Sequence, residues 1–567
     1  MTCGRVGYGS TAVAAGIIVT FTAVLLAPAA LGEPRAVPLS TNPGGTQLAL
    51  LHATHGDQAA IVDSAGRQVL LRGVNLNSLG DYYQANPGYP PTVPVTDADW
   101  DSMAAQGFNV VRLIVSWSLL EPSPGVIDGA YVTRVRAAVD AAKARGMYTV
   151  IDMHQDAWGK YIASPPGVVC PPGRSPAIGW DGAPQWATLT DGADTCRGAR
   201  REDSAAVKAA WDSFFADRDG IQSHLVGVWA RLATELGAEP AVAGYDLLNE
   251  PNEGADPSSS GPRLGAFYQR AIAAIRTAED TAGVAHHIAF FEPTVSGQLV
   301  PGGFTTDQNV VWAVHNYVES LFGGQIESFT KLLVDVGHGL YGTTVWFGEF
   351  GWFDDPAAQK PKVIRFGVQQ DRFGVGGAWW QWRQACGDPH TIGTPGGSPP
   401  PVLIHYQRNL CPGDVNEGPV PEWRVVLSRP YPRAVPGHLT GLLSSGDAGT
   451  MALTADGADP GSTQEARTFE VWAPGAAPPV VGGTGIADVT LTALFGGTRV
   501  TGTICTPAYA VTIGPVPDNG GNSLPRNCLA SPAPSSPAEV PAGSAPGAPA
   551  SSSGSAQPVT AMPTFTG

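Results

Sequence analysis

The chain has 567 residues, which is too long for one ordinary domain, and its hydrophobic content of 43% is enough to bury a large core. Its formal net charge of −16 argues against a nucleic acid or an anionic membrane surface as a partner held by charge. Only 14% of the residues are charged, so Gly, Ser, Thr and Pro must provide much of the solubility.

The N-terminal segment has the parts of a secretory signal. Arg5 gives a charged start, residues 11–27 form a short apolar run, and small residues follow at 27–30. We therefore expect residues 1–29 to be a signal peptide and the mature protein to be secreted, that is, extracellular. A retained N-terminal anchor is the alternative reading. Residues 30–57 form a Pro/Gly-rich lead-in.

Residues 58–423 alternate apolar, strand-like runs with amphipathic helical segments. Eight such runs predict an α/β fold, a (β/α)8 TIM barrel, because near-continuous apolar strands suit a parallel sheet that is buried on both faces. The expected strands are 69–76, 109–117, 148–154, 243–249, 287–293, 310–317, 344–349 and 376–382. Helical periodicity is clear in 131–145, 204–236, 263–280 and 356–373.

Two insertions follow expected strands, at 158–203 and at 384–420. Loops after barrel strands line the catalytic mouth, so we expect residues 158–203 to roof the substrate. Short alternating strands then predict a small C-terminal antiparallel β-sandwich over 424–530, with strands at 467–473, 487–494, 498–503 and 508–513. Residues 531–567 are rich in Ser, Pro and Ala and are expected to be disordered.

Six of the seven cysteines lie beyond the expected signal peptide. An even set in an exported chain indicates disulfides, although sequence alone leaves their connectivity open. We predict pairing between neighbours, because each bond would then clamp one loop-rich segment: Cys170–Cys196, Cys386–Cys411 and Cys505–Cys528. A metal site is not expected, because the sequence has no C-x-x-C motif or close His/Cys cluster.

Glu250 and Glu349 each close an apolar run, at the ends of the fourth and seventh expected strands. A parallel barrel delivers the C-terminal ends of all its strands to one face, so these two distant residues can be neighbours. Two carboxyl groups across a cleft can hydrolyse a glycosidic bond, because one protonates the leaving oxygen while the other attacks or activates water. Either alone could be a surface residue after a strand. The contexts Asn249-Glu250-Pro251 and Phe347-Gly348-Glu349-Phe350-Gly351 argue against that reading.

Further candidates for substrate binding lie within or after other expected strands. Arg112 lies in the second strand, and a cation near a nucleophilic carboxylate keeps it ionised. The amide of Asn249 could bond a sugar hydroxyl beside the scissile bond. The remaining candidates share strand faces: His154 and Asp156 with Asp152 on the third strand, His315 and Tyr317 at the end of the sixth, and Trp380 and Trp382 on the eighth.

These motifs resemble those of the glycoside hydrolases of family five, whose acid/base follows barrel strand four and whose nucleophile follows strand seven. The matching motifs are Val110-Val111-Arg112, Asp152-Met153-His154-Gln155-Asp156, Leu248-Asn249-Glu250-Pro251, His315-Asn316-Tyr317, Phe347-Gly348-Glu349-Phe350-Gly351 and Trp379-Trp380-Gln381-Trp382. The resemblance implies that Glu250 is the acid/base and Glu349 the nucleophile. It places Arg112, His154, Asn249, His315, Tyr317 and a terminal tryptophan around them.

Within that family the chain is most similar to endoglycoceramidases, from about residue 60 to about residue 520. The similarity rests on residues 152–159, on Cys386-Gly387-Asp388-Pro389-His390 and on Ser428-Arg429-Pro430-Tyr431-Pro432-Arg433-Ala434. It implies a retaining endo-β-glycosidase that cleaves between oligosaccharide and ceramide in glycosphingolipids, with no cofactor. It leaves glucosyl and galactosyl links to ceramide undistinguished.

Three further expectations follow from this reading. Arg112 and Tyr317 should hold the pKa of Glu349 down, and the charge of Glu349 should hold that of Glu250 up. An apolar surface for the lipid should come mainly from residues 158–203. We expect a monomer that makes peripheral contact with lipid micelles or membranes. The alternatives are an endo-β-glucanase acting on a polysaccharide and a non-catalytic carbohydrate-binding protein.

Overall fold

The computed structural model describes residues 48–85, 87–353, 355–392, 419–514 and 527–528. The predicted signal peptide, most of the lead-in and the predicted disordered tail lie outside these residues. All described residues belong to one compact unit, Gly44–Gly567. Within the described ranges, no helix combines the length and the apolar character that a membrane crossing requires.

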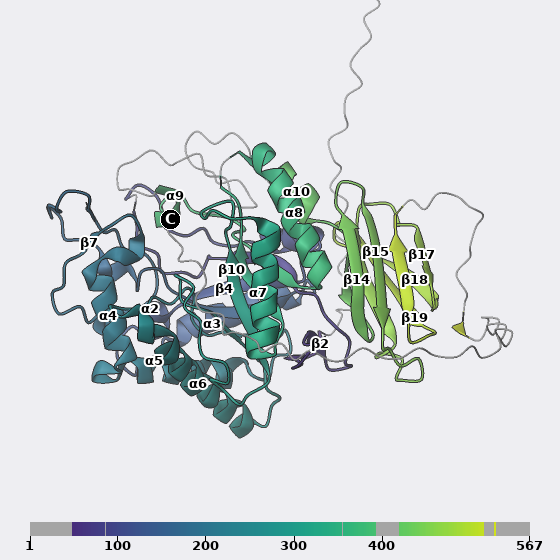
Figure 1. Cartoon of the computed structure of the whole chain (residues 1–567), viewed down its shortest axis with the longest axis horizontal. Helices are drawn as coiled ribbons and strands as arrows, with labels where there is room; N and C mark the ends of the chain where they lie inside the picture. The colour runs from purple at the N-terminus through teal and green to yellow at the C-terminus, as the bar shows by residue number, and fades with distance from the viewer. Residues whose placement is uncertain (1–47, 86, 354, 393–418, 515–526, 529–567) are drawn as a thin grey trace, which may run out of the picture. The chain divides into compact units, whose positions relative to one another are not determined.

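In Figure 1, helix α7 (Ile326–Tyr341) lies beside β10 (Val310–Asn316), one of eight parallel strands. The eight strands close into a barrel, and their order around it follows the chain. This confirms the predicted barrel and all eight expected strands. Almost every residue in them is buried, as expected for a sheet covered by helices outside and filled by side chains inside. The strands are β3 (Arg72–Leu76), β4 (Val110–Ser116), β5 (Tyr148–His154), β8 (Val242–Asp246), β9 (Ile288–Phe291), β10 (Val310–Asn316), β11 (Val345–Phe350) and β12 (Gly376–Trp379).

A short antiparallel pair, β1 (Leu51–Ala53) and β2 (Ile61–Asp63), precedes the barrel. Its apolar residues join a buried cluster with residues near the starts of barrel strands, such as Val110 and Tyr148. The last part of the lead-in therefore helps to fill the end of the barrel opposite the C-terminal ends of its strands.

The barrel helices have the capping residues and buried apolar faces that made most of the helical periodicity recognisable in the sequence. Helix α3 (Gly129–Lys143) is capped by Asp128, whose carboxylate accepts hydrogen bonds from the backbone N–H groups of Ala130 and Tyr131, and it buries one apolar face. The principal helices are α1 (Asp97–Ala105), α3 (Gly129–Lys143), α4 (Ala205–Phe215), α5 (Ile221–Leu236), α6 (Pro257–Ala282), α7 (Ile326–Tyr341) and α8 (Pro356–Phe373). Shorter helices are α2 (Trp117–Leu120), α9 (Pro389–Ile392) and α10 (Pro421–Leu427).

The single helix expected over 204–236 is wrong in one respect, because the chain forms two helices there. Asp217, Asp219 and Gly220 have φ of +50°, +52° and +77°. These left-handed conformations cannot continue a right-handed helix, so α4 ends and α5 starts anew.

The C-terminal region is antiparallel, as predicted, and forms two four-stranded sheets. Its strands lie within the predicted range 424–530, but those at 431–456 and at 481–484 were not among the strands predicted. One sheet contains β13 (Tyr431–Ala434), β16 (Thr468–Pro474), β19 (Gly497–Ile504) and β18 (Ile486–Leu494). The other contains β14 (His438–Ser445), β15 (Thr450–Asp456), β20 (Tyr509–Ile513) and β17 (Val481–Thr484).

Gly107, at the end of α1, connects the barrel to these sheets. The Tyr431 hydroxyl and an Arg433 N–H both donate to its carbonyl, at 2.7 and 2.9 Å. Its φ is +84°, and a Cβ there would lie 2.4 Å from ring atoms of Trp472. Glycine is therefore required by both backbone conformation and space.

Two of the three predicted disulfides are confirmed, Cys170–Cys196 and Cys505–Cys528. Cys386 is also disulfide-bonded, and its predicted partner Cys411 lies outside the described residues. The first bond spans the insertion at 158–203, which contains the small strand pair β6 (Ser175–Pro176) and β7 (Cys196–Arg197).

Candidate active site

A cavity of about 380 Å³ lies where the C-terminal ends of the barrel strands meet. Each of six strands contributes to its lining a residue at or just beyond its end: His154 (β5), Glu250 (β8), Glu292 (β9), His315 (β10), Glu349 (β11) and Trp380 (β12). Described residues of the two C-terminal sheets contribute nothing to this lining. The chemistry available to the cavity therefore comes from the barrel and its loops.

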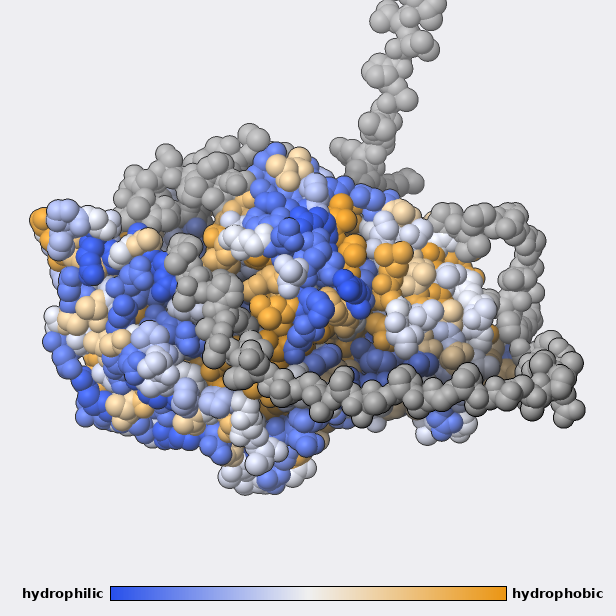
Figure 2. Space-filling view, in the orientation of Figure 1, coloured by the Kyte–Doolittle hydropathy of each residue, from blue (hydrophilic) through white to orange (hydrophobic). Residues whose placement is uncertain are grey.

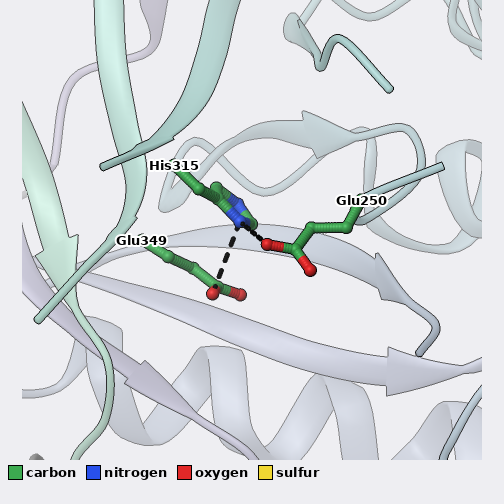
Figure 3. A group of neighbouring side chains, drawn as sticks. All are labelled: Glu250, His315 and Glu349. Atoms are coloured by element: carbon green, nitrogen blue, oxygen red, sulfur yellow. Dashed lines mark hydrogen bonds and ion pairs between the residues drawn. The ribbon is translucent and has the colours of Figure 1, made fainter. Parts of the chain in front are cut away.

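Glu250 and Glu349 face each other beside His315, as Figure 3 shows. The imidazole Nδ1 lies 2.8 Å from Oε1 of Glu250 and 3.4 Å from Oε2 of Glu349. The nearest carboxylate oxygens of the two glutamates, together with a ring nitrogen of His315, all lie within 4.8 Å of one another. The predicted pair is thus close enough to act on one bond.

Glu349 is buried and held by two donors. Arg112 Nη1 donates to Oε1 at 3.0 Å, and the Tyr317 hydroxyl donates to Oε2 at 2.8 Å. Asn75 orients the guanidinium by accepting a second bond from the same Nη1, at 3.1 Å. Both carboxylate oxygens are therefore fixed in position.

Arg112 is fully buried, and its charge is balanced by carboxylates from several strands. Besides Glu349, it forms ion pairs with Asp152, Asp246 and Glu292 at 2.9–3.0 Å. Burial lowers the pKa of Arg112, but these carboxylates raise it well above its ordinary value, so the cation is permanent. Its Nη2 also donates to Oδ1 of Asn249 at 3.0 Å, which fixes the residue before Glu250.

The backbone at Glu250 is strained, with φ of +38°, a region that non-glycine residues seldom adopt. Neighbouring side chains hold it there. Gln155 Nε2 donates to the carbonyls of Asn249 and Glu250 at 2.7 and 2.8 Å, and the Glu250 N–H donates to Oε2 of Glu292 at 2.9 Å. This turn directs the Glu250 side chain into the cavity.

Arg201, from the 158–203 insertion, is a partner of Glu250 that sequence reasoning missed. Its Nη2 lies 2.7 Å from Oε2 of Glu250 and 2.6 Å from Oδ1 of Asp156. Its guanidinium also stacks over Trp180, 4.8 Å from the ring centre. Because His315 occupies Oε1, both oxygens of Glu250 are engaged.

These contacts reverse the pKa directions expected from sequence. Burial raises the pKa of Glu250, but the hydrogen bond and charge of His315 and the charge of Arg201 outweigh it and lower the pKa to about 2. Burial raises the pKa of Glu349, and the charges of His315 and Arg112 offset this only in part. The expectation failed because it left out the effects of His315 and Arg201 on Glu250, and because burial dominates at Glu349.

A polar and aromatic group lines another part of the cavity. The rings of His154 and Trp380 are stacked, with centres 5.4 Å apart. Asp156 lies 2.9 Å from Nε2 of His390, and Nδ1 of His390 lies 2.8 Å from Asp388. This combination of carboxylates, imidazoles and flat rings suits sugar hydroxyls and C–H faces.

Trp382 does not reach the cavity, so its predicted pairing with Trp380 on one face is wrong. Strand β12 ends at Trp379, and the alternation of faces does not continue beyond it. The buried Trp382 ring donates instead to Oδ1 of Asp99 at 3.1 Å.

An apolar wall forms a further part of the lining. We define this wall as Leu321, Phe322, Phe329, Leu333 and Phe353. It comes from the loop after β10, from α7 and from the loop after β11, and Leu321 is 47% exposed. Figure 2 shows hydrophobic residues at the surface around α7.

The insertion at 158–203 contributes differently from what the sequence suggested. Apart from Trp180 and Ala199, its lining residues are charged: Arg197, Arg200, Arg201 and Glu202. The expectation that this segment is the main source of apolar surface is therefore wrong. Its tryptophans Trp158 and Trp186 pack instead with Trp117.

Among the residues that the structure describes, one group of side chains has donors spaced for a cation, namely Glu250, His315 and Glu349. Two cations, Arg112 and Arg201, already bind these carboxylates. A metal ion would have to compete with both guanidinium groups. The donor set therefore fits proton transfer and nucleophilic attack better than metal binding.

Some other site residues were also missed from the sequence, and only some of them had a recognisable sequence signal. Glu292 closes the fifth strand in the same Glu-Pro context as Glu250, so a systematic reading of strand ends would have found it. Asn75 and Asp246 are polar residues inside buried strands, which is also a readable signal. Arg201 and His390 lie in short helical turns within the two insertions, away from the barrel strands, and had no such signal.

Comparison with known proteins places the chain among glycosidases. A family model described as cellulase (glycosyl hydrolase family 5) matches residues 62–385. Endoglycoceramidase I of Rhodococcus hoagii (strain 103S) is 31% identical over 287 residues, which cover 46% of this chain and 52% of that protein. The chain thus aligns with about half the length of this relative.

Solved structures extend the similarity. A crystal structure of endogalactoceramidase is 43% identical with a TM-score of 0.74, and the match covers 82% of this chain and 100% of that one. Endo-glycoceramidase II from Rhodococcus sp., solved as a complex with ganglioside GM3, is 25% identical with a TM-score of 0.61, covering 81% and 99%.

Proposed function

Because the chain belongs to the cellulase family of glycosyl hydrolases, family 5, we propose that it is a retaining endo-β-glycosidase that releases oligosaccharide from ceramide in glycosphingolipids. The observation that carries this proposal is the Glu250–Glu349 pair in a cavity with both a polar, aromatic lining and an apolar wall. The relatives named as endoglycoceramidases and endogalactoceramidase support it.

The catalytic roles follow from position and contacts. Glu349 has both oxygens held by donors from Arg112 and Tyr317, as a nucleophile aimed at the anomeric carbon requires. Glu250 donates its proton to the glycosidic oxygen, which leaves with the electron pair of the broken C–O bond. Glu250 then takes a proton from water, and the water oxygen displaces Glu349 from the sugar.

The spacing favours retention of configuration. Retaining glycosidases place their carboxyl groups about 5–5.5 Å apart, whereas inverting enzymes leave about 6.5–9.5 Å for an intervening water. Here the nearest oxygens of the pair lie within 4.8 Å. Proton NMR of the first-released sugar tests this: a β-anomer supports the assignment, and an α-anomer overturns it.

The role of Glu349 is open to a direct test. Glu349→Gln keeps the volume of the side chain but removes the nucleophilic charge, so turnover should be lost while the fold persists. Asp307, on the loop before β10, pairs with Arg276 and does not line the cavity. Asp307→Asn is therefore a matched control that should retain activity.

The apolar wall is the feature that argues for a lipid leaving group. Burying acyl chains against it would contribute about 25 cal/mol per Å² of apolar surface. The loop after β5 and the loop after β10 lie three strands apart in the barrel order, so polar and apolar linings come from different sides. We assign the polar side to the sugars and the apolar wall to ceramide.

Comparing a glycosphingolipid with the same sugar on a short soluble aglycone tests this assignment. We expect a higher kcat/KM for the lipid, and Phe329→Ser should reduce that preference. Equal kcat/KM for the two substrates would mean that the acyl chains are not recognised. Faster turnover of a soluble β-glucan would instead favour the polysaccharide-cleaving alternative.

We also propose that the protein is exported and acts as a monomer at lipid micelles or membranes. The two disulfides support export, because such bonds persist in oxidising compartments. Mass spectrometry of the N-terminus of secreted protein tests the predicted cleavage after the first 29 residues.

A further inference from the structure

We propose that Arg201 is a mobile clamp on the acid/base: it binds Glu250 when the aglycone site is empty and releases it when the leaving group arrives. This inference rests on the proposed function in one respect, the role of Glu250 as acid/base. It adds a positioning residue, outside the barrel strands, that links occupancy of the site to proton transfer.

Both carboxylate oxygens of Glu250 have a partner in the structure. His315, from the barrel, lies 2.8 Å from Oε1, and Arg201, from the insertion, lies 2.7 Å from Oε2. An acid that protonates a glycosidic oxygen needs one of these oxygens to face that atom. One of the two partners must therefore give way when substrate binds.

Arg201 is the partner that can move. Its side chain is 21% exposed and extends from a short 3-10 turn (Arg201–Asp203) in the insertion, whereas His315 is 8% exposed and lies near the end of a barrel strand. His315 is further held by Glu292, which lies 3.2 Å from its Nε2. Displacing Arg201 disturbs no strand, so the leaving-group oxygen should replace its Nη2 at Oε2.

Arg201 keeps other partners when it releases Glu250. Asp156 lies 2.6 Å from Nη2, Glu202 lies 2.5 Å from Nε, and Trp180 lies under the guanidinium. Nη1 also contacts Nε2 of His390 at 3.3 Å, and His390 is in turn bound to Asp156 at 2.9 Å. The displaced cation can thus move toward Asp156 and keep both Asp156 and Glu202 as charge partners.

The clamp matches the two demands on Glu250. In the first step Glu250 must hold a proton, and the aglycone that needs this proton is the group that would displace Arg201. Once the aglycone has left, Arg201 can return to Oε2. The nearby cation then favours the ionised carboxylate, which is the form that accepts a proton from water.

The charged groups that face Glu250 define what the removal of Arg201 should change. They are Arg201 and Asp156 near Oε2, and His315 and Glu349 near Oε1, while Glu292 binds the Glu250 backbone N–H. Arg201→Gln removes one cation and leaves the other groups in place. The pKa of Glu250 should then rise, by about 1–3 units for the loss of an opposite charge at this range.

The test compares two substrates that share a sugar but differ in their need for a proton. One is an unactivated alkyl β-glycoside, and the other is a 2,4-dinitrophenyl β-glycoside, whose leaving group departs without protonation. For Arg201→Gln, the basic limb of the kcat/KM–pH profile should move up by about 1–3 units with the alkyl glycoside. With the dinitrophenyl glycoside it should stay in place.

Matched variants complete the test. Arg174, in the same insertion, pairs with Asp194 and lies outside the cavity, so Arg174→Gln should leave both profiles unchanged. Arg201→Lys keeps the positive charge, so the basic limb of its kcat/KM–pH profile should lie close to its original pH. An equal loss of kcat/KM for both substrates with unshifted limbs would make Arg201 merely structural and overturn the proposal.

Failure of the clamp can be told apart from failure of the proposed function. Glu250→Ala should lose activity on the alkyl glycoside, and azide should restore turnover of the dinitrophenyl glycoside. If Glu250→Ala retains full activity, the acid/base assignment fails whatever Arg201 does. If the enzyme shows no preference for lipid substrates, comparing the alkyl and dinitrophenyl glycosides still decides the role of Arg201.

Discussion

Replacing Tyr317 by Phe removes one of the two donors to the proposed nucleophile and little else. The hydroxyl donates to Oε2 of Glu349 at 2.8 Å, and Arg112 continues to hold Oε1. The Tyr317 ring is buried against Ile114 and Trp380, so Phe should keep its packing. The variant therefore isolates a single hydrogen bond to a carboxylate.

The expected magnitude follows from the charge on the acceptor. A hydrogen bond to a charged group contributes about 1.5–3 kcal/mol, which is about one to two pKa units. The bond stabilises the ionised form of Glu349, so its loss raises the pKa of that carboxyl further above the ordinary value. Only ionised Glu349 can attack, and activity is lost as pH falls through this pKa.

The acidic limb of kcat/KM should therefore move to higher pH by about one to two units. A 2,4-dinitrophenyl β-glycoside is the suitable substrate, because its departure needs no acid. Tyr341→Phe serves as control, since this buried hydroxyl donates to the carbonyl of Val300 at 2.9 Å and does not line the cavity. A limb that stays in place for Tyr317→Phe, or that moves equally in both variants, would refute the reasoning.

Three further predictions concern stability. Gly107→Ala should lower the free energy of unfolding by about 2 kcal/mol or more in urea titrations, whereas Gly125→Ala, also at positive φ but with open space around it, should cost less. Replacing Cys170 and Cys196 by Ser should cost about 2–4 kcal/mol and expose the insertion to limited proteolysis, and unchanged protection would contradict this. Burial raises the pKa of Asp181 to about 7, so the folded protein binds a proton there that the unfolded chain has released, and stability falls as pH rises toward 7. Asp181→Asn should reduce this fall in the free energy of unfolding between pH 5 and 8. Equal slopes for the variant and the original protein would contradict the prediction.

Strand positions were the most readable part of the fold, because parallel barrel strands are buried on both faces and stand out as apolar runs. Helix α1 was harder, since it buries only Trp100, Met103 and little else along one side. The break at Asp217–Gly220 depends on left-handed backbone in residues other than glycine, which propensity does not indicate. The strands at 431–456 were missed because many of their residues are partly exposed and lack a continuous apolar run.

The site divides in the same way between regular and irregular structure. Arg112, His315 and Tyr317 were found because barrel strands impose a position and a direction on the side chains within them and at their ends. Arg201 reaches Glu250 from a loop held by a disulfide and by tryptophan packing, and no local pattern encodes that path. The expected pKa direction of Glu250 was wrong partly for the same reason, since it depends on Arg201 as well as His315, whereas that of Glu349 was wrong because burial dominates there.

The buried guanidinium of Arg112 has a consequence for engineering. It pairs with four carboxylates from different strands, so replacing Arg112 would leave those buried negative charges without their shared cation at the bottom of the cavity. Libraries that randomise Arg112 and its four carboxylate partners should therefore yield mostly misfolded or inactive proteins. New substrate selectivity is better sought in the apolar wall, where Leu321 and Phe353 can be substituted without disturbing the buried ion pairs of Arg112.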